Sequence, residues 1–285
     1  MSNDGTKTGG VLYIVATPIG NLSDLSPRAA GILSEVDFVA AEDTRITVKL
    51  LNHLGIKKPM ISCYRHNELQ RTDTIIERIK NGESCALCSD AGTPAISDPG
   101  EELVRKAVEN NIPVIPIPGP SAVITALSAS GLITSRFCFE GFIPMNRKTR
   151  KKRLLELQNE ARTIVIYEAP HKLKRTLNDL LEYLGDRTVT LARELTKIHE
   201  EIVRTTLGEA VKKYADNEPR GEFVVIISGK LTEEAEDYTL EEAAELAKSF
   251  IKEGYSASEA AGKAAAETGI ARSIIYKAAV TGRCE

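Results

Sequence analysis

The chain has 285 residues, of which 42% are hydrophobic and 27% charged, and its formal net charge is −3 at pH 7. This length allows one large domain or two to three small ones, and the apolar fraction is enough to bury a core. The slightly acidic balance excludes a protein that binds nucleic acid over its whole surface, so such a surface must be a local patch. No segment reaches the length of a membrane span. The polar, glycine-rich residues 1–10 are expected to form a disordered lead rather than a signal peptide.

Five strand–helix units are predicted between residues 11 and 130. Each begins with a short apolar run, and these runs are residues 11–16, 37–41, 59–64, 85–88 and 112–117. Alternation of this kind predicts an α/β domain over residues 11–131, with a parallel sheet and helices on both faces. Every run ends in a polar or glycine- and proline-containing turn. Because the carboxyl ends of parallel strands meet at one edge, the five turns are expected to form a ligand-binding crevice.

The fourth turn, residues 89–100, is the most unusual of the five. Gly92 and Gly100 allow positive φ there, and the turn lacks the spacing of a P-loop or of a dinucleotide fingerprint. The alternative interpretation is a helix cap, with Asp98 as the N-cap and Pro99 at the first helical position.

Residues 136–230 are predicted to form a second α/β domain with more antiparallel hairpin character. Within it, residues 147–153 hold six basic residues in seven. The simpler interpretation of this run is a solvated helix start. The alternative is a patch that binds RNA through its phosphates, because closely spaced like charges repel unless a polyanion neutralises them. The candidate RNA-binding residues are Arg147, Lys148, Arg150, Lys151, Lys152 and Arg153.

The last part of the chain, residues 238–285, follows an acidic linker and carries helical periodicity over residues 240–251, 257–268 and 273–280. Two short helices across a glycine-containing turn are typical of a helix-turn-helix. A small helical cap is the favoured alternative, because acidic residues outnumber basic ones in this tail and helices that read DNA are usually basic.

The titratable residues give no complete catalytic set by spacing alone. The four histidines are scattered, and the acidic pairs Glu42-Asp43 and Glu200-Glu201 are adjacent in sequence, so their side chains diverge. The five cysteines are odd in number and four lie in or beside apolar runs, which indicates reduced thiols in a cytoplasmic protein. Cys85 and Cys88 have CxxC spacing without a second pair, so no metal site is expected.

Several ordered motifs together resemble one known family. They are residues 13–22 (YIVATPIGNL), 41–45 (AEDTR), 89–100 (SDAGTPAISDPG), 118–122 (PGPSA), 167–171 (YEAPH) and 220–223 (RGEF). This series is similar to the tetrapyrrole-methylase-like superfamily, and in it to the methyltransferases of small-subunit ribosomal RNA. The resemblance covers residues 11–230, and the tail resembles the helix-turn-helix appendage of the same group.

The resemblance implies two α/β domains of the tetrapyrrole methylase type, a small C-terminal helical domain, and S-adenosyl-L-methionine bound in the cleft between the two α/β domains. It implies methylation of the ribose 2′-hydroxyl of a cytidine in the 16S RNA, within the small ribosomal subunit, by a cytoplasmic homodimer. Residues carried over to the cofactor are Pro18, Asp90, Ala91, Gly92, Thr93, Ile96, Ser121, Ala122 and Tyr167.

Methyl transfer to a ribose hydroxyl is an in-line displacement that benefits from alignment and from a general base. Candidates for the base are Glu42, Asp43, Glu168, Glu194 and His171. Candidates for orienting phosphate are Arg45, Arg193 and Lys197.

Two other functions stay open at this point. A tetrapyrrole methylase would normally carry a Gly-Pro-Gly-Asp-like first turn, whereas this chain has Thr-Pro-Ile-Gly at residues 17–20. That difference and the basic run argue against a porphyrinoid substrate. A nucleic-acid-binding regulator that uses the C-terminal helices is the third hypothesis.

Overall fold

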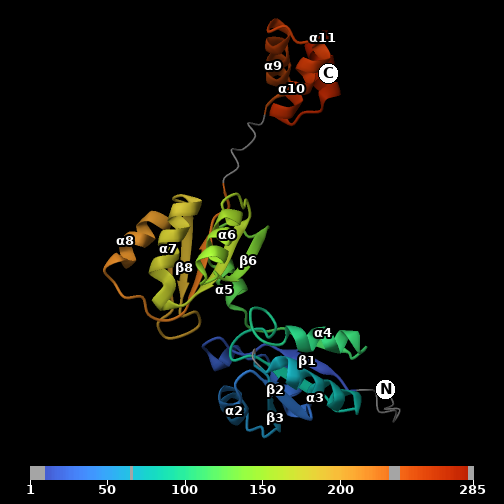
Figure 1. Cartoon of the computed structure of the whole chain (residues 1–285), viewed down its shortest axis with the longest axis vertical. Coiled ribbons are helices and arrows are strands. Elements are labelled where there is room, and N and C mark those ends of the chain that lie inside the picture. Colours follow the sequence, from blue (N-terminus) through green and yellow to red (C-terminus); the bar gives the residue numbers. More distant parts are fainter. Residues whose placement is uncertain (1–9, 65–66, 231–237, 282–285) are drawn as a thin grey trace. The chain divides into compact units, whose positions relative to one another are not determined.

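The computed structural model describes residues 10–64, 67–230 and 238–281 of the chain (Figure 1). The chain divides into two compact units between Gly229 and Lys230. Residues 1–9 of the expected disordered lead and residues 231–237 of the expected acidic linker, residues 230–237, lie outside the described residues. Gly10 was included in that lead, but it is buried and its amide donates to the carbonyl of Ile79 at 3.2 Å, so this residue belongs to the folded part.

The first half of unit one is a parallel sheet with helices on both faces. Its strands are β1 (Leu12–Val15), β2 (Phe38–Ala41), β3 (Met60–Ser62), β4 (Cys85–Cys88) and β5 (Val114–Ile117), in the order β3-β2-β4-β1-β5. The connecting helices are the short 3-10 helix η1 (Leu22–Asp24), α1 (Pro27–Glu35), α2 (Thr44–His53), α3 (Glu68–Lys80), α4 (Glu101–Glu109) and α5 (Ala122–Ser128). One buried cluster packs under α3 and α4, and another under α1 and α2. The predicted doubly covered sheet is therefore confirmed.

Of two helix starts in this half, one is determined by local sequence and the other by tertiary contacts. Helix α1 begins as predicted, because the hydroxyl of Ser26 accepts from the Ala29 amide at 3.1 Å and Pro27 opens the helix. The alternative interpretation of Asp98 as the cap of α4 is wrong, since Gly100 is the N-cap and has no side-chain cap of its own. The carboxylate of Glu68, on α3, instead accepts from the amides of Gly100 and Glu102 at 2.9 and 3.0 Å.

The second half of unit one is a mixed sheet. Its strands are β6 (Phe137–Phe142), β7 (Thr163–Glu168), β8 (Thr188–Arg193), β9 (Glu201–Thr206) and β10 (Phe223–Ile227), in the order β6-β7-β10-β8-β9. Only the β6·β7 pair is parallel, and β7·β10, β10·β8 and β8·β9 are antiparallel. Helices α6 (Arg147–Leu157), α7 (Pro170–Leu184) and α8 (Leu207–Ala215) contribute to the core on one face. The expected hairpin character is present.

Helix α5 joins the two halves of unit one. It follows the last strand of the first sheet, yet its side chains Val123, Ala126 and Leu127 pack against Val165 and Val224 of the second sheet. The figures show α5 directly beneath the second sheet (Figure 1). The turns at the carboxyl ends of β1, β4 and β5 are thereby held against the open face of β7, β8 and β10.

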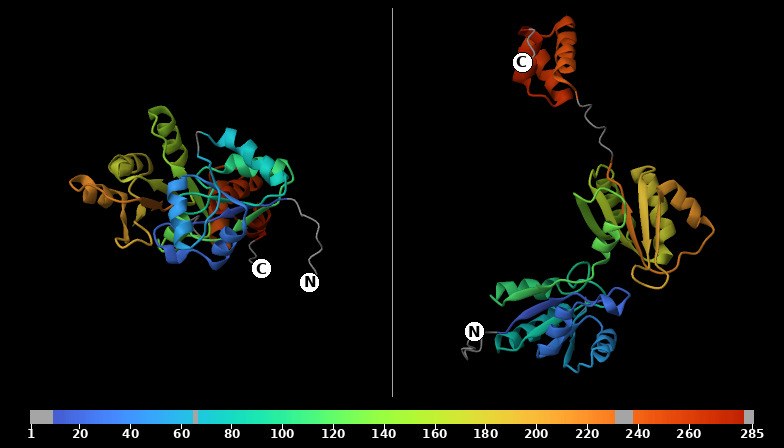
Figure 2. Two further views of the ribbon diagram at one scale, coloured as in Figure 1. Left: turned by 90° about the horizontal axis from the view of Figure 1, so that it is seen from below. Right: turned by 180° about the vertical axis from the view of Figure 1, so that it is seen from behind.

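Unit two is a bundle of three helices, α9 (Leu240–Lys252), α10 (Ala257–Thr268) and α11 (Arg272–Thr281), which pack on one another in each view (Figure 2). Their shared core is Ala243, Ala247, Ala261, Ala264 and Ile275. Capping boxes at Thr239 and Ser256 start α9 and α10. Within the described ranges of both units, no helix has the length and apolarity required to cross a bilayer.

Gly100 provides a test of the turn before α4. Its φ is +123° and an added Cβ would lie 2.6 Å from a methyl group of Leu87. Gly100→Ala is therefore expected to lower the free energy of unfolding by about 1–3 kcal/mol, measured by urea denaturation. Gly31→Ala is the matched control, because nothing lies within 4 Å of its added Cβ. In the middle of α1 that change is expected to raise stability by about 0.5–1 kcal/mol. Equal stability of the two variants would contradict the strained turn.

Candidate functional site

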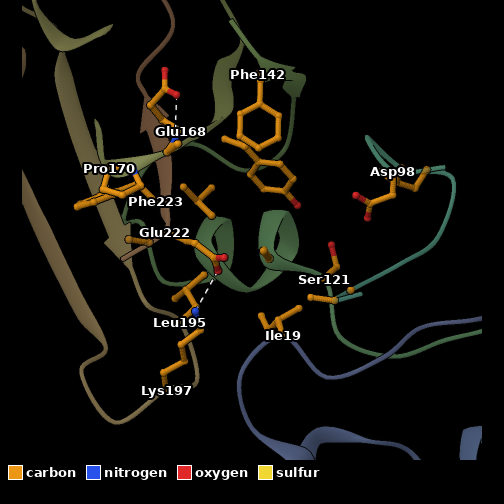
Figure 3. A pocket seen from close by; sticks show the side chains of 18 of the residues that line it. Ile19, Asp98, Ser121, Phe142, Glu168, Pro170, Leu195, Lys197, Glu222 and Phe223 are labelled. Atoms are coloured by element: carbon orange, nitrogen blue, oxygen red, sulfur yellow. Dashed lines mark hydrogen bonds and ion pairs between the residues drawn. The ribbon is translucent and has the colours of Figure 1, made fainter. Parts of the chain in front are cut away.

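A cavity with a volume of about 470 Å³, here called the large cavity, lies between the two halves of unit one (Figure 3). The first half contributes the turns after β1, β4 and β5. The second half contributes the β7–α7 junction, the β8–β9 loop and the start of β10. The lining residues are Ile19, Ala91, Gly92, Thr93, Ile96, Asp98, Ser121, Ala122, Phe142, Tyr167, Glu168, Ala169, Pro170, His171, Ala192, Leu195, Lys197, Glu222, Phe223 and Val224.

Most of the nine residues predicted for the cofactor lie together in this cavity. Seven of them are among its lining residues, namely Ala91, Gly92, Thr93, Ile96, Ser121, Ala122 and Tyr167. The other two, Pro18 and Asp90, line a second cavity of about 250 Å³ that is bounded by η1 and α2. The two cavities are separated by a backbone bridge in which Thr17 and Gly92 exchange hydrogen bonds of 2.9 and 3.0 Å. Asp90 faces one cavity and the next residue, Ala91, faces the other.

The loops around the large cavity hold strained backbone. Five described residues other than glycine have positive φ, and four of them are Ala95, Ser97, Glu194 and Thr196. Ala95 and Ser97 lie in the turn after β4, and Glu194 and Thr196 lie in the β8–β9 loop. Such conformations cost about 1–3 kcal/mol each and persist only where the surroundings enforce them, typically at functional sites. This clustering supports the cavity as the candidate site.

Aromatic rings form one wall of the cavity. Tyr167 packs edge-on against Phe139 with ring centroids 4.9 Å apart, and against Phe142 at 5.6 Å. Burial, and then the nearby negative charge of Asp98, raise the pKa of Tyr167 to about 12. The phenol therefore stays protonated at neutral pH and can donate a hydrogen bond, but it cannot act as a base.

A charged cluster lies at the opposite side of the cavity (Figure 3). The ammonium group of Lys197 donates to the carboxylates of Glu194 and Glu222, both at 3.0 Å. Partial burial alone would lower the pKa of Lys197, but the two carboxylates raise it above its ordinary value. The loop that carries Lys197 packs against the turn after β1, since an added Cβ on Gly20 would lie 2.5 Å from the Lys197 side chain. Lys197 is thus a fixed cation rather than a base.

Glu168 and His171 line the cavity from the β7–α7 junction. Glu168 is only 3% exposed, and both of its oxygens are occupied. One accepts from the Ala169 amide at 2.9 Å and the other from the Thr176 hydroxyl at 2.5 Å. Its carboxylate points away from the cavity (Figure 3), so Glu168 is a poor candidate for the base. His171 is exposed on the first turn of α7.

Three other predicted catalytic residues, Glu42, Asp43 and Arg45, lie next to Asp90 but do not themselves line the second cavity. The Asp90 amide donates to Glu42 at 3.2 Å, and the Asp43 amide donates to the Asp90 carboxylate at 3.1 Å. Asp43 is the N-cap of α2, and Arg45 pairs with it at 2.6 Å. Asp43 and Arg45 therefore neutralise one another, and neither is a lining residue of the two cavities. Burial raises the pKa of Asp90, with the charge of Asp43 adding to that effect.

Arg193 and Glu194, also predicted as catalytic, support the β8–β9 loop without lining the large cavity. Arg193 pairs with Glu201 at 2.9 Å, and its buried Nε atom has no hydrogen-bond partner among the residues that the structure describes. Besides Lys197, Glu194 accepts from the Glu222 amide at 2.9 Å. An added Cβ on Gly221 would lie 2.4 Å from the Glu194 side chain, so the two segments are in close contact.

The basic run is the start of α6, and it does not form a uniform patch. Arg147, Lys148, Lys151 and Lys152 are exposed, whereas Arg150 is 3% exposed. Arg150 is held inside by an ion pair with Asp179 at 2.6 Å. The prediction that Arg150 contacts RNA is therefore wrong, because its guanidinium group faces the core. Of the outward residues, Arg153 also pairs with Glu140 and Glu156 at 3.4 and 3.0 Å.

Sequence reasoning missed several lining residues, among them Ile19, Asp98, Phe142 and Glu222. Ile19 and Asp98 belong to two of the turns that the sequence predicts to form the crevice. The sequence does not show, however, that residues of one turn face two different cavities. Phe142 lies beyond a register shift of the β6·β7 pair, between Phe139 and Phe142. Glu222 belongs to the motif at residues 220–223, but only its bond to Lys197 shows that it is part of the site.

Comparisons with known proteins agree with this arrangement. Residues 11–211 match the profile of the family described as Tetrapyrrole (Corrin/Porphyrin) Methylases. A protein of Synechocystis sp. named Ribosomal RNA small subunit methyltransferase I is 48% identical over 94% of this chain and 96% of its own length. A protein of the same name from Bacillus subtilis is 41% identical over 98% of this chain and 97% of its own. The solved structure of the methyltransferase CobJ superposes with a TM-score of 0.60 over 78% of this chain and 95% of its own, at 18% identity.

The chain therefore belongs to the tetrapyrrole methylase family, and within it to the group of the ribosomal RNA small subunit methyltransferases I. The resemblance, the α/β fold class and the prediction of a methyltransferase are thereby confirmed. Another fold neighbour, the uroporphyrin-III C-methyl transferase of Thermus thermophilus, was solved in complex with S-adenyl homocysteine (TM-score 0.56, 18% identity, 77% of this chain and 97% of its own).

The pairing of Asp43 with Arg45 can be tested through the pKa of Asp43. Hydrogen bonds from Arg45 hold the pKa of Asp43 at about 2, below its ordinary value of 3.8. A depressed carboxyl pKa contributes stability above the unfolded-state value, and this contribution is lost as the pH falls through the folded-state value. In Arg45→Gln, the Asp43 pKa is expected to rise towards 3.8, measured by carboxyl NMR titration, and stability between pH 4 and pH 2 should depend less steeply on pH. Lys49→Gln is the control, in which the pKa of Asp43 should rise less because Lys49 contributes less to its lowering. An unchanged Asp43 pKa in Arg45→Gln would refute the pairing.

Proposed function

We propose that this chain transfers a methyl group from S-adenosyl-L-methionine to the ribose 2′-hydroxyl of a cytidine in the RNA of the small ribosomal subunit. The observation that carries the proposal is the large cavity, in which seven of the nine residues expected for the cofactor converge from both halves of a tetrapyrrole methylase fold. The named relatives supply the substrate class.

The side chains around the cavity suit this methyl donor. Its volume lies in the range of about 300–1,000 Å³ that is usual for small-molecule sites. The apolar side chains of Ile19, Leu195 and Phe223 offer a surface for an adenine ring. The amino end of the 15-residue helix α7 has no side-chain cap and lines the cavity, which favours a carboxylate. Asp98 and the Tyr167 hydroxyl can accept from the amino and ribose groups.

When bound, the cofactor supplies an electrophilic methyl group on a sulfonium centre. The protein's share is to align the attacking oxygen and to receive its proton. Of the candidate bases, two line the cavity, namely Glu168, whose two oxygens already accept hydrogen bonds, and His171. We assign to His171 the role of receiving the proton of the ribose hydroxyl. Lys197 would orient the anionic sugar–phosphate backbone beside it.

The second cavity lies on the other side of the Thr17–Gly92 bridge and would receive a nucleotide that neighbours the target. Lys49 and Asp90 line it, and these side chains offer a donor and an acceptor for a base edge. Pro18 shapes this side rather than the cofactor cavity.

The exposed cations of α6 would contact the RNA backbone. Arg147, Lys148, Lys151 and Lys152 form this surface, defined here as the α6 cationic surface. Phosphate contacts of this kind fix position without reading sequence. We also propose that the enzyme acts on the assembled small subunit, as a homodimer in the cytoplasm. The buried free thiols of Cys63, Cys85, Cys88 and Cys138 suit a reducing compartment.

The methyl-transfer reaction can be tested directly. The purified protein is expected to bind S-adenosyl-L-methionine in calorimetry and to transfer a labelled methyl group to small subunits that lack the modification. His171→Gln should bind the cofactor normally while kcat falls by about 10²–10⁴-fold, the usual contribution of a general base. Transfer to a tetrapyrrole instead of RNA would favour a tetrapyrrole methylase. Failure to bind the cofactor would favour a nucleic-acid-binding regulator.

The α6 cationic surface can be tested through the salt dependence of RNA binding. Changing Lys148, Lys151 and Lys152 together to Ala should weaken RNA binding. It should also reduce the slope of log K against log salt by about 2–3, because each phosphate contact contributes roughly 0.7–0.9. A double change of Arg105 and Lys106 to Ala on α4 removes ion-paired cations and should leave the slope unchanged. Equal slopes for the two variants would remove this surface from the RNA interface.

A further inference from the structure

A buried chain of hydrogen bonds runs from the basic helix α6 to the wall of the large cavity. The Arg150 Nε atom donates to Asp179 at 2.6 Å, and its Nη2 atom donates to the Thr176 hydroxyl at 2.9 Å. The Thr176 hydroxyl in turn donates to Glu168 at 2.5 Å. The second oxygen of Glu168 accepts from the Ala169 amide at 2.9 Å.

The direction of this chain is fixed by chemistry. A guanidinium group can only donate, so the Thr176 oxygen accepts from Arg150 and its single proton is left for Glu168. Arg150, Thr176 and Glu168 are 3%, 0% and 3% exposed, so water does not replace any of these contacts. Hydrogen bonds to charged groups in such surroundings strengthen one another, and an unsatisfied member would be costly.

The chain ends where the cavity begins. Glu168, Ala169, Pro170 and His171 follow one another along the cavity wall. Helix α7 has no side-chain cap at its N-cap residue Ala169, and Pro170 has no amide hydrogen. The carboxylate of Glu168, held from behind by Thr176, is therefore the group that fixes this junction. A role limited to anchoring α6 on α7 would need the Arg150–Asp179 pair but not the step from Thr176 to Glu168.

We infer that Arg150 and Thr176 are positioning residues for the methyl-donor site, which act through Glu168 to hold the wall at residues 168–171. This inference rests on the proposed function of the large cavity. It gives the six basic residues of α6 two separate tasks, because Arg150 orders the cofactor wall while its outward neighbours face RNA.

The test uses the full-length protein and variants that keep side-chain volume. Thr176→Val removes the hydroxyl that joins Arg150 to Glu168. Its dissociation constant for S-adenosyl-L-methionine is expected to rise about tenfold in calorimetry, and kcat at saturating cofactor should also fall because the same wall carries His171. Thr176→Ser restores the hydroxyl and should restore affinity. Arg150→Lys keeps the charge but loses the planar fork whose separate nitrogen atoms reach Asp179 and Thr176, so it should show a smaller loss and serves if Thr176→Val does not fold.

Thr72→Val is the matched control. Thr72 is also 0% exposed, and its hydroxyl has no hydrogen-bond partner in the described part of the chain, so the change should leave cofactor affinity unaltered. Hydrogen exchange at the Ala169 amide provides a readout without cofactor and should accelerate in Thr176→Val only. Unchanged affinity and exchange in a stably folded Thr176→Val would overturn the inference. If the wild type binds no S-adenosyl-L-methionine, the proposed function fails, whereas faster exchange at Ala169 would still support the positioning chain.

Discussion

The two hydrogen bonds between Thr17 and Gly92 are the contact on which the rest of the site depends. They bring the turn after β1 against the turn after β4, two neighbouring strands of the first sheet. Thr17 is buried, and its hydroxyl also donates to the Ser89 carbonyl at 3.2 Å. Because this bridge runs across the edge of the sheet, it divides the crevice into two cavities. Residues on one side face the second half of unit one, and residues on the other side face α2.

The two loops that complete the large cavity are costly to form locally. Ala95, Ser97, Glu194 and Thr196 adopt positive φ without being glycine. Each loop is therefore held by contacts outside itself. Ser97 lies close to Gly141, where an added Cβ would be 2.7 Å from its hydroxyl oxygen, and Glu194 is held by its bond to the Glu222 amide on the segment before β10. The shape of the cavity thus depends on both halves being folded and docked through α5.

The fold could be predicted from this sequence because each of its signals is local. Apolar runs followed by Gly- and Pro-containing turns predict parallel strands, and Ser26 before Pro27 predicts the start of α1. The site could be predicted only in part. Which turn residues face which cavity depends on the Thr17–Gly92 bridge, a contact between residues 75 positions apart. The capping of α4 by Glu68 is likewise tertiary, and nothing in the sequence near Asp98 indicates it.

The case of Arg150 shows why a charge run is the hardest signal to interpret. Six basic residues in seven erase the polar–apolar periodicity that would reveal the inward face of a helix. One residue of the run must nevertheless face the core, and a buried cation is tolerated only when it is paired. Arginine suits that position better than lysine, because its planar fork can donate to Asp179 and Thr176 at once. The run is therefore not a single functional element, and its division between core and surface is decided by α7, the helix against which it packs.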